Sequence, residues 1–404
     1  MKTLFLGLGK VNLAIARQID GEKIAFVENG DQLVISRSTG LESKFEEIET
    51  ITATFDYFNW KKYLPAQVFI SPGIDPRRPF FKDVIASEAR EIDFFCSRFK
   101  GKTIAITGTD GKSTFTTQLG EVLKRALPKL KIFVGGNLGT AMADALSEPY
   151  DIAVLEISSF QAERLKAAKF ELVVILNLDT DHLDRYDSIT DYHNAKWGLL
   201  RFAAKAAYPV PLAPSFPTSR SVITYNNREN LSQILLELTH YLSEKLKFDF
   251  QNTLLKSLPR LPHRLERKQD LEGRTFVNDS KATTVHAVMY GLRTFQKEFS
   301  RVQLILGGKF KGDDFSRLAT VARALDRILI YGEAAESIRK QLKNSKLDMI
   351  SFPSLEELLK SILPTIKTGD CLLLSPGCSS YDEFKNYEER GEYFWSEIRK
   401  LYSI

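Results

Sequence analysis

A short glycine-containing segment carries the residue types that bind a nucleotide triphosphate. Residues 104–114 read IAITGTDGKST, so an apolar run leads directly into a turn with glycines, a lysine and hydroxyl groups. In such a turn the backbone N–H groups point at phosphate oxygens, Lys112 adds a point charge, and Ser113 or Thr114 can bind magnesium. The strict P-loop consensus would place a glycine at Ile106, and a plain structural turn is the alternative. We predict nucleotide binding, because an apolar run precedes the turn and an amphipathic stretch follows it.

Polar side chains end two further apolar runs. Glu156 follows one run and Asn177 follows the next. The carboxyl ends of parallel strands meet at one edge of a sheet, so we expect Glu156 beside the phosphate loop, where its carboxylate can hold magnesium. His182 lies in the polar loop after Asn177, and we interpret it as a metal or substrate ligand, with a structural histidine as the alternative. From the local sequence alone, we expect Lys196 to be a solvated lysine on a helix.

Two turns near the start of the chain could bind a nucleotide. Residues 7–12 read GLGKVN, so Asn12 replaces the third glycine of the dinucleotide fingerprint, and a plain turn is an equally good interpretation. Glu28 ends the next apolar run, where an acidic residue often meets a ribose. The sequence SPG at 71–73 follows the third run. We expect these turns at the ligand-binding edge of one parallel sheet.

Three polar clusters follow apolar runs in the last third of the chain. They read NDSKAT at 278–283, GGKFKGDD at 307–314 and SPGCSS at 375–380. Together they predict a second ligand-binding edge on a separate domain, and their lysines suit an anionic substrate that bears a carboxylate. Ordinary loop chemistry is the alternative for any one of them.

The composition is that of a soluble globular protein. A length of 404 residues exceeds what one hydrophobic core serves, so two or three domains are expected. The 56 basic and 51 acidic residues are dispersed, and their balance of +5 gives no support for nucleic-acid binding. Cys96, Cys371 and Cys378 lack metal-ligand spacing and fit a reducing cytoplasm. The apolar start is too short for a signal peptide, and no segment has the length of a membrane span.

Apolar runs of strand length alternate with helical patterns along almost the whole chain. This alternation predicts an α/β protein with parallel sheets covered by helices. A helix is expected near 83–95, and the prolines of 208–217 predict an extended loop. The runs fall into three sets, namely 4–6, 24–27 and 68–70, then 103 onward, 132–134, 152–155 and 173–176, then 302–306, 328–330 and 371–374. We therefore predict domains at 1–98, 99–262 and 263–404.

Taken together, these motifs resemble the Mur ligases, a family of ATP-dependent amide-forming enzymes of peptidoglycan precursor synthesis. The resemblance covers nearly the whole chain in the family's order, through GTDGKST at 108–114, GGNLG at 135–139, EISSF at 156–160, DH at 181–182, AK at 195–196, PHR at 262–264 and the three C-terminal clusters. Segments 278–283 and 375–391 are similar to the branch that adds D-glutamate. The resemblance implies an N-terminal Rossmann-like UDP-binding domain, a central P-loop-type ATPase domain with a mostly parallel sheet, and a C-terminal Rossmann-like domain.

The resemblance also implies the reaction and its partners. ATP would phosphorylate the carboxylate of UDP-N-acetylmuramoyl-L-alanine, and the amine of D-glutamate would attack the acyl phosphate. Two Mg²⁺ ions and a carbamylated Lys196 are the implied cofactors. We expect no nucleic-acid partner, no membrane insertion, a monomer and a cytoplasmic location.

The site residues follow from the resemblance by position. Lys112, His182 and Lys196 would be catalytic. The implied metal ligands are Ser113 or Thr114, Glu156, His182 and Lys196. The implied ATP-binding residues are Gly108, Thr109, Asp110, Gly111, Lys112, Ser113, Thr114, Asn227, Asn230, Arg264, Asp279 and Lys281. The implied UDP-substrate residues are Gly9, Lys10, Val11, Asn12, Glu28, Ser71, Pro72, Gly73, Asn137 and His182. D-glutamate would be framed by Thr283, Lys311, Ser380, Tyr381 and Tyr387, with Lys311 pairing a carboxylate.

Some positions depart from the family pattern. Asp110 stands where the family usually has asparagine, which adds a negative charge beside the triphosphate. Residues 226–230 read NNREN in place of the usual His-Asn-x-x-Asn, and the region 205–258 is shorter than is typical. The competing readings are another amide ligase of this architecture, such as another Mur enzyme or a folylpolyglutamate synthase, a nucleotide-binding regulatory module without turnover, and a P-loop kinase or motor ATPase.

Overall fold

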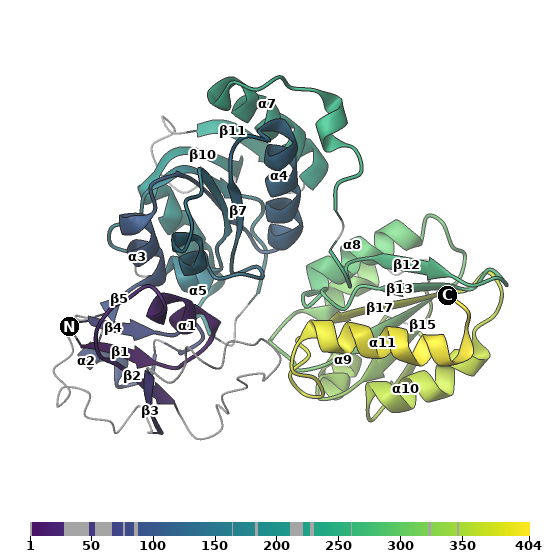
Figure 1. The fold of residues 1–404 in the computed structure, drawn as a ribbon. Coiled ribbons are helices and arrows are strands. Elements are labelled where there is room, and N and C mark those ends of the chain that lie inside the picture. The colour runs from purple at the N-terminus through teal and green to yellow at the C-terminus, as the bar shows by residue number, and fades with distance from the viewer. Residues whose placement is uncertain are drawn as a thin grey trace. The chain divides into compact units, whose positions relative to one another are not determined.

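The computed structural model describes residues 2–27, 48–52, 67–75, 77–84, 88–163, 165–181, 185–210, 221–226, 230–259, 261–321, 325–345 and 347–404. The chain forms two compact units. Unit 1 comprises Met1–Leu178 and Thr190–Pro259, and unit 2 comprises Asp179–Ile189 and Arg260–Ile404. The described residues form three sheets (Figure 1), of which two lie in unit 1 and one in unit 2.

The first sheet of unit 1 is parallel, with strand order β3-β2-β1-β4-β5. Side chains alternate between its faces, so Leu4 and Leu6 pack in one apolar cluster while Phe5 packs in another, with the residues of the first helix. The strands are β1 (Thr3–Leu6), β2 (Lys23–Val27), β3 (Ile48–Thr52), β4 (Gln67–Ile70) and β5 (Glu88–Ala89). The helices are α1 (Lys10–Ala16), α2 (Phe81–Val84) and α3 (Glu91–Arg98).

The second sheet of unit 1 is also parallel, with strand order β11-β10-β9-β6-β8-β7. Buried residues of α4 and α7 pack on one face, and those of α3 and η6 pack on the other. The strands are β6 (Lys102–Thr107), β7 (Ile132–Gly136), β8 (Ile152–Glu156), β9 (Phe170–Ile175), β10 (Ala203–Val210) and β11 (Ser221–Asn226). The helices are α4 (Lys112–Ala126), η6 (Met142–Leu146), α5 (Ser159–Ala162), α6 (Ile189–Trp197), η7 (Gly198–Phe202), α7 (Leu231–Leu246) and η9 (Asn252–Leu255).

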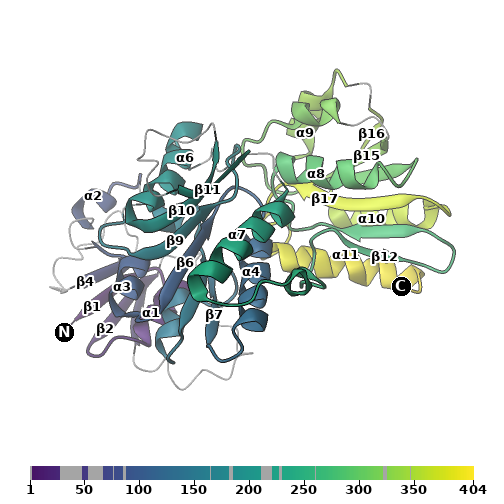
Figure 2. The same cartoon turned by 90° about the horizontal axis from the view of Figure 1, so that it is seen from above.

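The sheet of unit 2 has strand order β12-β13-β17-β14-β15-β16, and only its edge strand β12 runs antiparallel among the described strands. Helices α8 and α9 lie on one face and α10 and α11 on the other (Figure 2), and their buried residues belong to two separate apolar clusters. The strands are β12 (Glu266–Gln269), β13 (Thr275–Asn278), β14 (Val302–Gly307), β15 (Leu325–Tyr331), β16 (Met349–Phe352) and β17 (Cys371–Gly377). The helices are α8 (Val285–Phe295), η10 (Phe315–Thr320), α9 (Ala335–Leu342), α10 (Leu355–Ile362), η11 (Leu363–Thr365) and α11 (Tyr387–Leu401).

The apolar runs found in the sequence are strands of these sheets, but two local expectations were wrong. The helix expected near 83–95 is divided into α2 and α3 by the short strand β5. The loop expected over 208–217 begins as strand, because β10 continues to Val210 and pairs with β11. The pairing of β10 with β9 ends at Ala207, so among the described strands β10 is paired only with β11 at Pro209, which is an edge-like position where proline is accepted.

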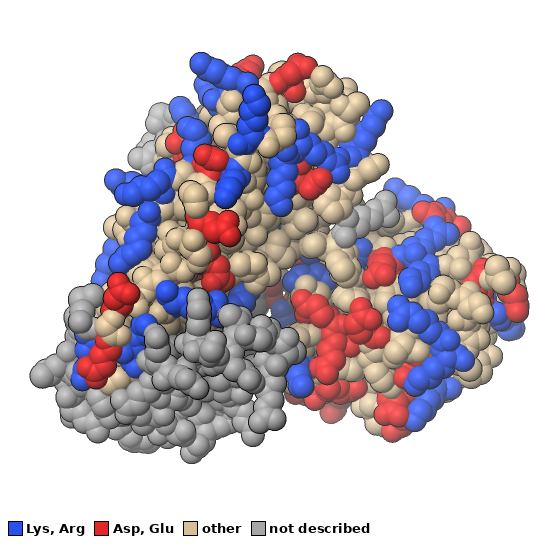
Figure 3. All heavy atoms as spheres, in the orientation of Figure 1, with Lys and Arg blue, Asp and Glu red and all other residues tan. Residues whose placement is uncertain are grey.

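The surface agrees with the dispersed charge of the sequence. Acidic and basic side chains both occur on each unit in the view of Figure 3. The three cysteines are free thiols. Among the helices that the structure describes, none is both long and apolar enough to cross a bilayer.

Candidate active site

The phosphate loop joins strand β6 to helix α4. Its end requires a glycine, because Gly111 has φ +79° and a Cβ there would lie 2.4 Å from the Cδ1 atom of Leu231. The first turn of α4 contains no acidic residue, so its N-terminus can attract an anion. The Nζ atom of Lys112 folds back on the loop and donates to the carbonyls of Gly108 (3.0 Å) and Thr109 (2.7 Å). The loop therefore has the backbone and the charge expected of a phosphate site.

Asn177 fixes this loop from the end of strand β9. Its Oδ1 atom accepts hydrogen bonds from the backbone N–H groups of Thr109 (3.2 Å) and Asp110 (2.8 Å). Its Nδ2 atom donates to the carbonyl of Asp110 at 3.0 Å. The sequence placed Asn177 at a strand end but assigned it no role. Its polar side chain directly after an apolar run was the only signal.

Two buried oxygens lie at the same edge of the sheet. Glu156 ends β8, whose register with β6 pairs it with Ile106 just before the loop. Its side chain is buried; the Oε1 atom accepts from Nδ2 of Asn137 at 3.0 Å, and the Oε2 atom has no hydrogen-bond partner. The Oγ1 atom of Thr114, in the first turn of α4, is likewise buried without a partner.

These oxygens suit a divalent cation. A carboxylate and a hydroxyl are ligands that Mg²⁺ prefers, and it completes its shell with phosphate oxygens and water. Buried polar atoms without partners are uncommon and call for an explanation, which such an ion supplies. The described residues contain no group of three or more His, Cys, Asp or Glu side chains placed to hold a metal by themselves.

Lys196 is buried in helix α6, which the sequence alone did not predict. Its Nζ atom lies 3.9 Å from the centre of the Tyr192 ring. The Tyr192 hydroxyl lies 3.3 Å from Oγ1 of Thr109 in the phosphate loop. The lysine and the loop thus share a neighbour, and Tyr192 is a residue of this site that the sequence analysis missed.

The turns of the first sheet come together at its topological switch point, between β1 and β4. Gly7 has φ +75°, and a Cβ there would lie 3.0 Å from the Cβ atom of Ser71, so the turns that contain Gly9 and Gly73 are neighbours. The Nδ2 atom of Asn12 closes the first turn by donating to the carbonyls of Leu6 (3.2 Å) and Gly7 (2.6 Å). Asn12 therefore has a structural task, and only its oxygen remains for a ligand. Lys10 donates to the carbonyl of Gly139.

Unit 2 carries its polar clusters at the ends of β13, β14 and β17, as the sequence predicted. Asp279 is buried; its Oδ1 atom accepts from the amide of Leu265 (3.2 Å) and its Oδ2 atom accepts from Oγ of Ser375 (2.9 Å). Lys281 places its Nζ atom 4.0 Å from the centre of the Tyr387 ring. The hydrogen bond from Ser375 to Asp279 joins the polar clusters at 278–283 and 375–380.

Lys311 is held by a protein carboxylate. Its Nζ atom lies 2.8 Å from Oδ1 of Asp181. Burial lowers the pKa of Lys311, but the carboxylates of Asp181 and Asp313 outweigh it, so the pKa is raised and the lysine stays charged. Thr283 is half-buried, Ser380 is buried, and Tyr381 is 70% exposed.

Arg390 organises the loops around these residues. Its buried guanidinium donates to Oγ (2.9 Å) and O (2.8 Å) of Ser280 and to the carbonyl of Cys378 (3.1 Å). The Oγ atom of Ser280 in turn donates to the carbonyl of Tyr387 at 2.8 Å. Sequence analysis missed this role, because an arginine in a helix is ordinarily read as a surface residue.

Some predicted residues cannot be placed or have another visible task. Glu28, His182 and Asn227 lie outside the described residues. Asn230 caps α7 by accepting from the amide of Ser232 at 2.9 Å. The Nε atom of Arg264 is buried and has no hydrogen-bond partner.

The fold and these loops define an α/β protein of three sheets with a nucleotide-type phosphate loop in the second. Residues 106–248 match the Mur ligase middle domain, and residues 263–378 match the Mur ligase glutamate ligase domain. The chain belongs to the Mur ligase family. The resemblance found in the sequence and the predicted fold class are confirmed, while the domain boundaries and residue roles stay predictions.

Several relatives carry one name. The UDP-N-acetylmuramoylalanine–D-glutamate ligase of Aquifex aeolicus is 35% identical over 366 residues, which are 81% of this chain and 86% of the relative. That of Pseudomonas aeruginosa is 29% identical, with 98% of each chain covered.

Solved structures show the same fold. A UDP-N-acetylmuramate-alanine ligase of Thermotoga maritima has a TM-score of 0.62 at 16% identity, over 99% of both chains. A MurF ligase of Thermotoga maritima in complex with ADP has a TM-score of 0.63 at 13% identity, over 98% of this chain and 97% of that one.

Proposed function

We propose that the protein is an ATP-dependent ligase that joins D-glutamate to UDP-N-acetylmuramoyl-L-alanine. The observation that carries this proposal is the phosphate loop with a buried, unpartnered Glu156 oxygen beside it, in a chain of this family. The relatives named above support the choice of D-glutamate as the amino acid. The nucleotide substrates and the absence of a membrane-spanning helix among the described residues support a cytoplasmic location. We expect the protein to act as a monomer.

The chemistry requires activation of a carboxylate. A bare carboxylate is a poor acyl donor because it would have to expel oxide, so its oxygen first attacks the γ-phosphorus of ATP and ADP leaves. The amine of D-glutamate then attacks the acyl carbon, loses a proton, and expels phosphate as the amide forms. The protein contributes positioning and charge stabilisation to both steps.

The phosphate loop would hold the triphosphate. The N–H groups at the start of α4 would face the phosphates, and Lys112 would exchange its bonds to the carbonyls of Gly108 and Thr109 for the β- and γ-phosphates. Asn230, Arg264, Asp279 and Lys281 would contact the remainder of ATP, together with Asn227.

Magnesium fits the residues present. Ser113 or Thr114 and Glu156 would hold one ion, and His182 with a carbamylated Lys196 would hold the second. When bound, such ions neutralise charge on the transferring phosphoryl group. The burial of Lys196 against Tyr192 supports a role beyond a surface lysine. A carbamate there would replace a cation by an anion able to bind the metal.

The other substrates would bind at strand ends of the first sheet of unit 1 and of the sheet of unit 2. D-glutamate would lie among Thr283, Ser380, Tyr381 and Tyr387, with a carboxylate on Lys311. That lysine is already oriented by Asp181, so the substrate would meet a fixed charge. The UDP-substrate would lie on the turns 9–12 and 71–73 with Glu28, and its muramoyl end would reach Asn137 and His182.

ADP release tests the proposal. Purified protein with ATP, magnesium and UDP-N-acetylmuramoyl-L-alanine is supplied with D-glutamate, L-glutamate, other amino acids or no acceptor. We expect release that depends on both the UDP-substrate and D-glutamate. Release with a different acceptor would keep an amide ligase but refute the specificity, and ATP binding without any release would favour a regulatory protein.

A further inference from the structure

A buried asparagine of unit 2 connects three segments of its sheet edge. Asn278 ends strand β13, and its side chain is fully buried. Its Oδ1 atom accepts from the backbone N–H of Ser280 at 3.1 Å, and its Nδ2 atom donates to the carbonyl of Gly391 in α11 at 2.8 Å. Both partners are backbone groups with fixed roles, so they determine which end of the amide is oxygen and which is nitrogen.

The same amide determines the tautomer of His263. The Nδ2 atom of Asn278 lies 3.0 Å from Nδ1 of the ring. Because an amide nitrogen only donates, Nδ1 has to accept and carries no proton. The neutral ring then holds its proton on Nε2, which lies 3.4 Å from Oε1 of Glu392. A charged imidazole would instead turn one N–H group against another at Nδ1.

Two carboxylates face the same ring. Glu392 on α11 lies near Nε2, and Oε2 of Glu266 on β12 lies 3.9 Å from Nδ1. Glu266 also accepts from the backbone N–H of His263 at 3.0 Å. Negative charges beside an imidazole favour its charged form. The donor of Asn278 is therefore the group that opposes a proton on Nδ1.

Helix α11 packs its backbone against the ring. His263 is buried, and a Cβ atom at Gly391 would lie 2.3 Å from its Nδ1 atom and 2.5 Å from its Cγ atom. Glycine inside a helix costs stability relative to alanine, so the close approach of the ring gives a reason for Gly391. The imidazole thus lies between the α11 backbone and the Asn278 amide.

His263 belongs to a strained turn. It has φ +57°, and Leu265 has φ +45°, values that residues other than glycine rarely adopt. Such a turn persists only where its surroundings hold it. The carbonyl of His263 accepts from the N–H of Lys281 at 3.0 Å, and the N–H of Leu265 donates to Oδ1 of Asp279 at 3.2 Å. The backbone on both sides of Arg264 is thereby fixed to the cluster that carries Lys281 and Asp279.

We propose that Asn278 is a positioning residue of the ATP site, which fixes His263 as the neutral Nε2–H tautomer and so holds the strained turn. The turn carries Arg264, and the segment bonded to it carries Asp279 and Lys281. The inference rests on the proposed function, in which these three residues contact ATP. Asn278 acts through His263 in this role, and neither is needed as a ligand of the nucleotide.

Nitrogen NMR tests the tautomer without any substrate. The chain has five histidines, so a two-bond ¹H–¹⁵N spectrum of protein labelled at histidine contains few signals, and His263→Gln identifies those of His263. At pH 8 we expect a neutral ring with its proton on Nε2. A proton on Nδ1 in the wild type would overturn the inference, whether the ring is charged or neutral.

Two variants test the effect on ATP. Asn278→Asp puts a carboxylate oxygen where the amide nitrogen lies, so Nδ1 has to donate, and at pH 8 the KM for ATP should rise by about tenfold or more with a smaller change in kcat. The rise over the wild type should shrink at pH 6, where a charged imidazole can donate from both nitrogens. Gly391→Ala keeps the amide but displaces the ring, so it should raise the KM at both pH values. Asn344→Asp, at an exposed position of unit 2, makes the same charge change and should match the wild type.

The outcomes separate this inference from the proposed function. The expected tautomer with an unchanged KM in either of the two variants would overturn the positioning role and leave the ligase intact. An equal rise for Asn278→Asp at pH 6 and pH 8 would also overturn it, because general loosening of the fold has no such pH profile. No turnover of ATP by the wild type would refute the proposed function and the ATP-site role, while the spectrum still decides the tautomer. If Asn278→Asp fails to fold, Gly391→Ala decides the kinetic test, because alanine suits the helical backbone.

Discussion

Replacement of Asn177 by alanine should destabilise the phosphate loop and weaken ATP binding. The side chain makes hydrogen bonds to Thr109 N, Asp110 N and Asp110 O. Each such bond stabilises by about 0.5–1.5 kcal/mol, which gives an upper range of about 1.5–4.5 kcal/mol for the set. Asn177 is only half-buried, so water can replace part of this, and we expect a loss of about 2 kcal/mol. If this free energy stabilises the ordered conformation of the loop that binds ATP, its loss weakens ATP binding by about 10- to 30-fold.

Calorimetric titration with a non-hydrolysable ATP analogue and urea denaturation measure the two effects together. Asn177→Asp is the informative partner, because its oxygen can still accept from the Thr109 and Asp110 amides while its second oxygen faces the Asp110 carbonyl. We expect it to lie between wild type and Asn177→Ala. Asn252→Ala, at an exposed position, is the control and should leave both measurements unchanged.

An unchanged affinity for the analogue in Asn177→Ala would refute this reasoning. It would mean that the loop keeps its shape without the side chain. A stability loss with unchanged nucleotide affinity would place the whole effect on folding. Either result would remove Asn177 from the nucleotide site.

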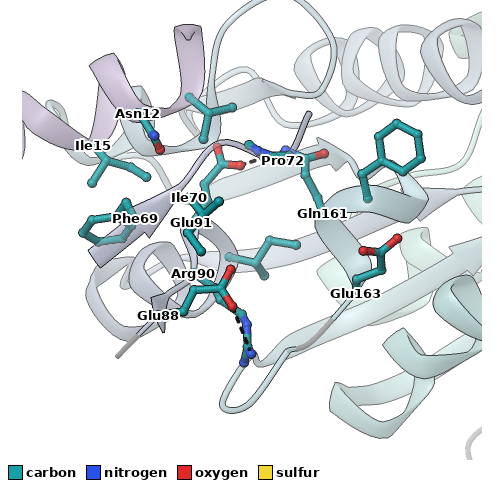
Figure 4. Close-up of a pocket in the computed structure, with 13 residues that line it drawn as sticks. Asn12, Ile15, Phe69, Ile70, Pro72, Glu88, Arg90, Glu91, Gln161 and Glu163 are labelled. Atoms are coloured by element: carbon teal, nitrogen blue, oxygen red, sulfur yellow. Dashed lines mark hydrogen bonds and ion pairs between the residues drawn. The ribbon is translucent and has the colours of Figure 1, made fainter. Parts of the chain in front are cut away.

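Three further predictions follow from charged groups of unit 1. Asp110→Asn should lower the KM for ATP by about two- to fivefold, because a half-exposed negative charge beside the triphosphate is removed; the effect should shrink at high salt, and an unchanged or larger KM would count against it. Lys196→Ala should nearly abolish ligation, with partial recovery on addition of a small carboxylic acid, and activity retained without the acid would contradict a carbamate ligand. Burial raises the pKa of Glu91 (Figure 4) from 4.5 to about 7. The contribution of Glu91 to the free energy of unfolding is therefore fully present below pH 4.5 and is lost as the pH rises through 7. Glu91→Gln should therefore raise the free energy of unfolding at pH 8, by at most about 3 kcal/mol, and change it little at pH 4, whereas an equal change at both pH values in urea denaturation would contradict the assignment.

The sequence could predict what depends on local pattern. The apolar run before Gly108 predicts a strand, and the amphipathic stretch after the turn predicts a helix. The structure has β6 and α4 at these places. The same holds for the polar clusters after β13, β14 and β17. Around β5 the sequence has no clear turn signal between neighbouring elements. The local pattern therefore did not predict that a short strand separates α2 from α3.

The contacts that shape the site could not be predicted, because they join distant parts of the chain. Asn177 reaches the loop across 67 residues, Glu91 reaches Gln161 across 70, and Arg390 reaches Ser280 across 110. Each is a polar residue whose default interpretation is a solvated surface group. Only the tertiary fold buries these side chains and so makes their hydrogen bonds necessary.

Two of the lysines proposed to bind substrates already have protein partners. Lys112 donates to loop carbonyls, and Lys311 pairs with Asp181. Ligand binding would then exchange interactions, so its free energy is the difference between the new contact and the old one. This exchange favours selectivity, because a phosphate competes better than a carbonyl for Lys112, while a neutral ligand would leave the existing bond in place.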